Sequence, residues 1–187
     1  MANFGAGNPS DARLFEEVSP MLKNMPETPY DKTDLAILDR LQREGRIANV
    51  DLADAVALSP SSCLRRTKAL EGEGIIAGYR AELDRTRAGL GLTVFIALKV
   101  AQHSRETSRQ IETALVAIPA VVACHVVSGE ADFLIEAVVP DLGAYERMLL
   151  DHILAIESVT DARSTFAIRT VLSRGPLPLD HLGPVRP

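Results

Sequence analysis

The chain has 187 residues, 47% hydrophobic and 24% charged, proportions typical of a globular protein with one domain or two small ones. No apolar run reaches the roughly 18 residues that cross a bilayer, because the longest candidate, Leu90 to Leu98, is interrupted by Gly91 and followed by Lys99. The acidic first residues lack the apolar centre of a signal peptide. We therefore expect a cytoplasmic protein that has no membrane partner.

The net charge of -5 argues against a nucleic-acid partner, because phosphate binding needs concentrated lysine and arginine. The distribution of charge along the chain changes that conclusion. Residues 31–90 carry 10 basic and 10 acidic groups, whereas residues 1–30 carry 2 and 4 and residues 91–187 carry 8 and 11. Only the middle segment escapes the acidic bias.

The first third of the chain predicts an extension followed by two helices. Glycine and proline recur through residues 1–30 without a sustained apolar period, so we expect a flexible extension there. From Asp31 the spacing becomes helical, with leucines on one stripe and Gly45 as a stop. A second, short helix follows, for which Asn49 or Asp51 is the expected N-cap.

A third helix is predicted from the Ser59-Pro60 pair, in which serine caps and proline occupies the first helical position. It runs to about Glu71, ends at the glycines that follow, and leads to the extended segment Ile75 to Tyr79. Three helices and a β-ribbon over residues 31–80 predict a winged helix-turn-helix domain.

The second half predicts a βαββαβ order after a linker at residues 81–91. Apolar residues alternate in the strands, Ser104 and Asp141 begin the helices, and Pro119 ends the first of them. This order over residues 92–172 is the ferredoxin-like arrangement, so the whole chain is α+β. Residues 173–187, rich in proline, are expected to form a loose tail. The expected strands are Leu92–Val100, Val121–Val127, Phe133–Val139 and Val159–Val171.

The third helix has two different faces at 100° per residue. One face carries Cys63, Thr67 and Leu70 and packs, while the opposite face is small, polar and basic. No acidic residue lies between Ala55 and Leu70. Such a face suits the major groove, where early helix residues meet base edges and flanking cations meet phosphates. The candidates are Ser61, Ser62 and Arg65 for bases, and Arg66 and Lys68 for phosphates.

Two other interpretations of this domain remain open. A cluster of three charges is more often a solvated helix face than a binding site. Winged helices also mediate contacts with proteins, so a non-DNA interaction or oligomerisation module is the alternative function.

Four segments resemble the Lrp/AsnC family of transcription regulators, over roughly Tyr30 to Val171. They are DKTDLAILDRLQREGR at 31–46, LSPSSCLRRTKALEGEGII at 58–76, VSGEADFLI at 127–135 and VPDLGAY at 139–145. The stretch ACHVVSGEADFLIEAVVPDLGAY looks most like the leucine-responsive branch. The resemblance implies a RAM-type second domain, a homodimer that can assemble to an octamer, double-stranded DNA as partner, and an amino acid as effector.

The resemblance also implies an effector pocket between subunits, near the turn from Gly129 to Asp132 and the last strand. A carboxylate such as Asp132 can hold an ammonium group by a charge-assisted bond, and Gly129 permits close backbone approach. The alternative is that both residues serve only the turn. The candidates carried over by position are Gly129, Asp132, Leu142, Tyr145, Thr165 and Phe166.

Four positions depart from the family pattern. Ala57 stands in the helix-turn-helix turn where glycine is favoured, and Thr67 stands where an aliphatic residue is usual. Glu130 and Ala131 replace the usual aspartate and aromatic residue, so the identity of the effector is open.

An enzyme would have to use Glu130 and Asp132 as a general acid and base, with His125 nearby. The sequence offers no nucleophile with a partnered base, no phosphate-binding loop and no metal-ligand spacing. Cys63 and Cys124 are far apart and are expected to be reduced core thiols. We expect no catalysis, no metal and no cofactor other than the effector.

Overall fold

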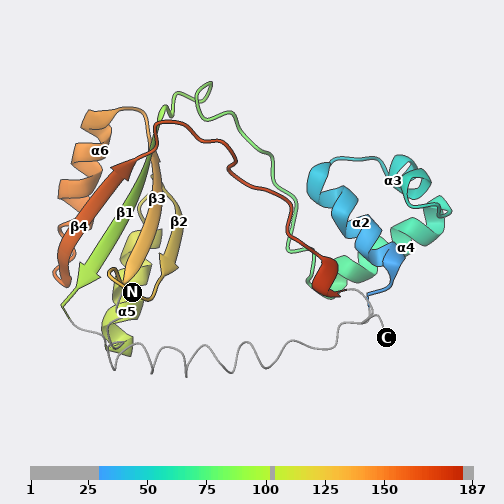
Figure 1. Cartoon of the computed structure of the whole chain (residues 1–187), viewed down its shortest axis with the longest axis horizontal. Helices are drawn as coiled ribbons and strands as arrows, with labels where there is room; N and C mark the ends of the chain where they lie inside the picture. Colours follow the sequence, from blue (N-terminus) through green and yellow to red (C-terminus); the bar gives the residue numbers. More distant parts are fainter. Residues whose placement is uncertain (1–29, 102–103, 183–187) are drawn as a thin grey trace, which may run out of the picture. The chain divides into compact units, whose positions relative to one another are not determined.

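The computed structural model describes residues 30–101 and 104–182, so the predicted N-terminal extension lies outside the described residues except for Tyr30. These residues form two compact units (Figure 1). The first unit combines residues 30–82 with residues 172–182, and the second unit is Leu83–Val171. Within the described residues, no helix is both long and apolar enough to cross a membrane.

The first unit contains three helices, α2 (Lys32–Arg43), α3 (Asn49–Ala55) and α4 (Pro60–Gly72). Asp31 caps α2, because its carboxylate accepts from the backbone N–H groups of Thr33 (2.8 Å) and Asp34 (2.9 Å). The Asp34 carboxylate in turn accepts a hydrogen bond from the backbone N–H of Asp31, which completes a capping box. The buried core of this unit is Ile37, Leu38, Leu52, Ala53, Cys63 and Leu70.

The predicted start of the third helix is confirmed, and the predicted cap of the second is wrong. Ser59 accepts from the backbone N–H of Ser62, and Pro60 is the first residue of α4. The N-cap of α3 is Ala48, which makes no side-chain bond, and Asn49 lies inside the helix. The Asn49 amide instead donates to the carbonyl of Pro60 at 2.8 Å, so it ties α3 to the beginning of α4.

The β-ribbon expected after the third helix is not formed in the described chain. Residues 75–84 contain no strand, and the first strand of the described residues begins at Leu92. Ile75 and Ile76 pack instead against the apolar core of the first unit. Their side chains are therefore partly buried although this segment forms no strand in the described chain.

The second unit is a four-stranded antiparallel sheet in the order β2-β3-β1-β4. This order and the βαββαβ succession confirm the ferredoxin-like arrangement. Helix α6 continues through a π-helical turn, Leu149–Ile153, which the spacing did not predict. The elements are β1 (Leu92–Val100), α5 (Arg105–Val116), β2 (Val121–Val126), β3 (Phe133–Val139), α6 (Leu142–Met148) and β4 (Val159–Phe166).

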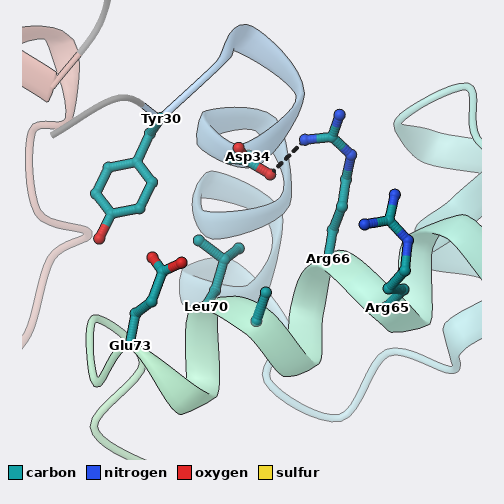
Figure 2. Close-up of a pocket in the computed structure, with 7 residues that line it drawn as sticks. Tyr30, Asp34, Arg65, Arg66, Leu70 and Glu73 are labelled. Atoms are coloured by element: carbon teal, nitrogen blue, oxygen red, sulfur yellow. Dashed lines mark hydrogen bonds and ion pairs between the residues drawn. The ribbon is translucent and has the colours of Figure 1, made fainter.

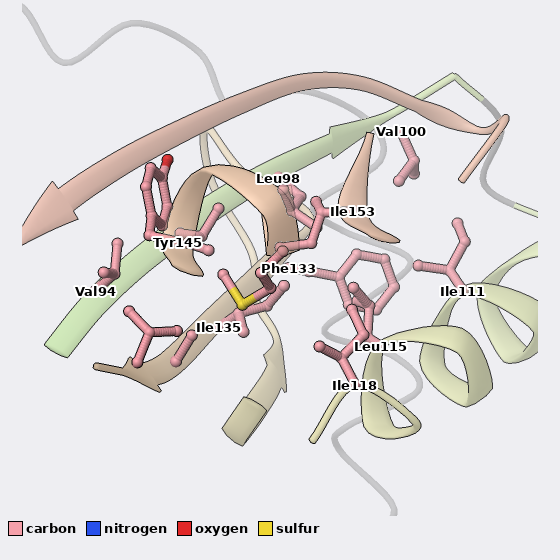
Figure 3. Close-up of a cluster of buried hydrophobic side chains, with 14 residues drawn as sticks. Val94, Leu98, Val100, Ile111, Leu115, Ile118, Phe133, Ile135, Tyr145 and Ile153 are labelled. Carbon is pink, nitrogen blue, oxygen red and sulfur yellow. The ribbon is translucent and has the colours of Figure 1, made fainter. Parts of the chain in front are cut away.

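One face of this sheet and the two helices enclose the core, which Figure 3 shows in detail. From β1, alternate residues from Val94 to Val100 point into it, as the period of two requires. Phe133 and Ile135 enter from β3, and the helices contribute a further set of apolar side chains. That set is Ile111 and Leu115 from α5, Tyr145 and Met148 from α6, and Ile153 from the π turn.

The last strand is shorter than expected. Of the tail predicted at 173–187, residues 183–187 lie outside the described residues, and part of the rest packs on the first unit. β4 ends at Phe166, which pairs with Val94, so only two residues of β1 remain beyond that pair. In the tail, the Leu179 side chain packs against the apolar core of the first unit. The backbone N–H of Leu177 donates to Gln42 Oε1 at 2.6 Å, and Gln42 Nε2 donates to the Leu177 carbonyl at 3.4 Å.

Candidate DNA-reading helix and effector region

The outward face of α4 carries the side chains that the sequence singled out for DNA. Cys63 and Leu70 are buried, which fixes the opposite side of the helix toward solvent. Ser61, Arg65 and Lys68 are exposed there. The hydroxyls of Ser61 and Ser62 lie 3.3 Å and 2.9 Å from the Ser59 hydroxyl, so the first turn of α4 is a connected group of serine hydroxyls.

The three cations of this helix have different environments. Arg65 and Lys68 make no ion pair with any residue that the structure describes. Arg66 is held by two carboxylates: its Nη1 lies 2.8 Å from Asp31 Oδ2 and 2.8 Å from Asp34 Oδ1. The expected phosphate contact of Arg66 therefore competes with an intramolecular role.

A hollow beside this ion pair is shown in Figure 2, lined by residues of α4 and of the N-terminal end of α2. Arg65 and Arg66 lie at one end, and Tyr30 and Glu73 lie at the other. Burial and the negative charge of Glu73 raise the pKa of the Tyr30 hydroxyl. Since the far end is acidic, this hollow is not built to hold a phosphate.

The two departures in the helix-turn-helix both have structural consequences. Ala57, in the turn before α4, has a φ of 54°, the left-handed conformation that favours glycine. The Thr67 hydroxyl is buried without a hydrogen-bond partner among the described residues. The first departure stores backbone strain, and the second leaves a buried polar group unsatisfied.

The predicted effector residues fall into two groups within one chain. Gly129 and Asp132 lie in the turn beside the end of β1, where the backbone N–H of Asp132 donates to the Leu98 carbonyl at 2.8 Å. Phe166 pairs with Val94, four residues earlier on that strand. At about 3.4 Å per residue, the groups are separated by roughly 13 Å or more along the sheet.

At the turn, Asp132 is engaged with the neighbouring strand. Its Oδ2 accepts from the backbone N–H of Val100 at 2.9 Å, where the register of β1 against β4 shifts. Gly129 has a φ of 127°, which a larger residue rarely adopts. Glu130 is exposed and lies 3.8 Å from Arg163. The turn thus depends on both Gly129 and Asp132 for its own geometry.

At the opposite end, an open and mainly apolar hollow lies next to the beginning of β1. Leu142 and Phe166 line it. The Tyr145 ring meets the Phe166 ring edge-on, 5.0 Å between centroids, and its hydroxyl donates to Ser164 at 2.6 Å. Tyr145 is therefore a nearly buried support for Phe166, and Thr165 lies on the other face of the sheet, opposite Phe95.

Both units are similar to known protein domains. A model of the Lrp/AsnC ligand binding domain matches residues 93–177, and a model of winged helix-turn-helix DNA-binding domains matches residues 30–77. The chain belongs to the Lrp/AsnC family. It is therefore a DNA-binding transcription regulator whose second unit is a ligand-binding domain.

This Lrp/AsnC protein matches its relatives over almost their whole length. The leucine-responsive regulatory protein of Escherichia coli K12 is 36% identical over 149 residues, 80% of this chain and 91% of that protein. Among solved structures, a transcriptional regulator of Neisseria meningitidis in complex with L-Met has a TM-score of 0.78 at 38% identity, covering 82% of this chain and 99% of that one. An AsnC family regulator of Agrobacterium tumefaciens has a TM-score of 0.78 at 35% identity, covering 81% and 99%.

Proposed function

We propose that α4 is the recognition helix, with Ser61, Ser62 and Arg65 facing base edges in the major groove of double-stranded DNA and Lys68 facing phosphate. The observation that carries this proposal is the pair of exposed cations, Arg65 and Lys68, that no described residue neutralises. Binding DNA costs these side chains no internal ion pair. A regulator of this kind acts where the chromosome is, in the cytoplasm of a bacterial or archaeal cell.

The experiment uses labelled duplex from upstream of the protein's own gene and titrates it at several salt concentrations. Lys68→Gln should weaken binding to operator and competitor DNA alike and lower the salt slope by about 0.9. Arg65→Gln should instead change the preference for operator over competitor. Arg109→Gln, an exposed charge on α5 of the other unit, is the control and should change neither. Unchanged binding by both α4 variants would assign DNA binding elsewhere.

For the ligand-binding domain, we propose that the effector binds between two copies of the chain and is an amino acid. The turn at Gly129 and Asp132 and the hollow at Leu142 and Phe166 are too far apart for one amino acid to touch both within a chain. A second copy can bring one group to the other. The relative from Neisseria, solved with L-Met, and the leucine-responsive relatives support an amino acid.

The dimer should form through the sheet face that no described helix covers, which we name the open sheet face. It presents Phe95, Ala97, Leu134, Glu136 and Thr165. Phe95 and Leu134 are 40% and 37% exposed, a large apolar exposure for strand residues in the middle of a sheet. Higher assembly to an octamer is part of the same proposal.

Sedimentation of two matched variants tests the dimer. Phe95→Asp places a charge on the open sheet face and should yield monomers. Val116→Asp places the same charge at the exposed end of α5 and should leave the dimer intact. Dimers of the Phe95 variant that are as stable as the original would place the interface on another surface.

Thermal shift with L-Leu, L-Met and the other common amino acids tests the effector. Asp132→Asn keeps an oxygen for the Val100 N–H while removing the charge that we assign to the ammonium group of the effector. It should abolish the ligand-dependent shift, whereas Glu130→Gln, in an exposed side chain of the same turn, should keep it. An unaltered response of the Asp132 variant would remove this residue from the site.

A further inference from the structure

Arg66 joins the recognition helix to the first turn of α2. Its guanidinium bridges Asp31, the N-cap of α2, and Asp34, three residues further on. Those carboxylates also form the capping box, so the ion pair is attached to a fixed helix end. The Arg66 and Asp34 side chains are only 29% and 16% exposed, which makes this contact part of the packing between the helices (Figure 2).

The buried face of α4 is not entirely apolar. Cys63 and Leu70 are buried, but Thr67 between them brings an unpartnered hydroxyl into the same face. The ion pairs of Arg66 adjoin this weak point. Arg65 is the preceding residue and points about 100° away from Arg66, so its direction follows from the rotation of the helix.

Moving Arg66 to a phosphate would break two ion pairs within the protein. It would leave Asp31 and Asp34 next to each other without their shared cation, and it would bring a phosphate toward them. The Arg66 guanidinium, with one nitrogen close to two carboxylates, is therefore expected to keep these partners when DNA binds.

We propose that Arg66 is a positioning residue for DNA recognition: through Asp31 and Asp34 it fixes the rotation of α4, and it does not itself contact phosphate. This inference rests on the proposed role of α4 as recognition helix. It replaces the expected phosphate contact of Arg66 and leaves Arg65 and Lys68 as the cations that meet DNA.

The direction in which one substitution changes DNA affinity distinguishes a positioning role of Arg66 from a phosphate contact. Asp34→Asn removes a negative charge near DNA, so it should strengthen binding if Arg66 is thereby released to phosphate. In the positioning role it should weaken operator binding by about three- to thirtyfold. Asp39→Asn is the matched control, because Asp39 is another α2 carboxylate in an ion pair, 2.9 Å from Arg43 of the same helix rather than from a residue of α4.

The full experiment measures operator affinity, competitor affinity and the salt slope for Asp34→Asn, Arg66→Gln and the double variant, on the duplex from upstream of the gene. We expect both single variants to lose preference for operator. The double variant should bind operator no more weakly than the weaker-binding single variant, and the salt slope should be the same for all of them. Unfolding curves establish that each variant is folded at the assay temperature. If Arg66→Gln does not fold, the sign for Asp34→Asn decides alone.

Two results would overturn the inference: tighter DNA binding by Asp34→Asn, or a salt slope lowered by about 0.9 in Arg66→Gln. The proposed function fails separately, through unchanged binding by Arg65→Gln and Lys68→Gln. If those two variants behave as expected while Asp34→Asn binds more tightly, only the role of Arg66 is wrong.

Discussion

The turn before α4 contains an alanine in a backbone conformation that disfavours alanine. Ala57 has a φ of 54°, and a left-handed conformation costs an L-residue about 1–2 kcal/mol. Ala57→Gly removes that strain but gives back about 0.4–1 kcal/mol through the larger conformational freedom of glycine in the unfolded chain. The net expectation is a gain of about 0.5–1 kcal/mol in the free energy of unfolding of this unit.

Hydrogen exchange measures this gain unit by unit in the intact protein. Amides of α3 and α4 that exchange through unfolding should slow by about two- to fivefold in Ala57→Gly. Ala55→Gly is the matched control, two residues earlier, equally exposed but helical, and it should speed the same amides. Unchanged or faster exchange in Ala57→Gly would refute the claim that this turn is strained.

Three further substitutions test the stability of the first unit. Thr67→Val removes a buried, unpartnered hydroxyl and should add about 1 kcal/mol to the free energy of unfolding; no gain would mean that the hydroxyl has a partner. Leu179→Ala should destabilise this unit by about 1 kcal/mol, since the side chain packs on its core, whereas Leu177→Ala, in an exposed side chain, should not. A hydrogen bond from the backbone of Asp34, and then one from the Arg66 side chain, lower the pKa of Asp31. The ionised Asp31 therefore stabilises the unit near neutral pH, and this stabilisation is lost below about pH 4. Denaturation curves at pH 7 and pH 3 should show a smaller acid loss in Asp31→Asn, and an equal loss would contradict this assignment.

Local signals predicted most of the fold. The Ser59-Pro60 pair, Ser104 and Asp141 begin helices where expected, because a cap depends only on neighbouring backbone groups. The alternation of Leu92 to Val100 gave β1 its correct bounds for a similar local reason. These features need no knowledge of distant parts of the chain.

The wrong predictions each depend on a distant partner. Asn49 has the residue type of a cap, but its amide bonds the Pro60 carbonyl 11 residues away. The apolar pattern after Gly72 suits a strand, and only the core of the first unit decides that Ile75 and Ile76 pack without one. The tail looked loose because prolines dominate it, whereas Leu179 has a place in a core far earlier in the sequence.

The same distinction applies to the functional residues. The outward face of α4 follows from helical periodicity, so Arg65 and Lys68 could be chosen from the sequence. Arg66 could not be separated from them, because its partner Asp34 lies 32 residues away. Likewise, only the pairing of β3 and β4 with β1 shows that Asp132 and Phe166 lie at different ends of the sheet.

The central claim is that this Lrp/AsnC protein reads DNA through α4 and responds to an amino acid. Fluorescence anisotropy of a labelled duplex from upstream of its gene, with unlabelled competitor and with or without L-Leu or L-Met, tests it most directly. The account predicts specific binding that at least one amino acid alters and that Arg65→Gln makes less selective. Binding that is absent, or equal for operator and competitor under every ligand, would contradict it.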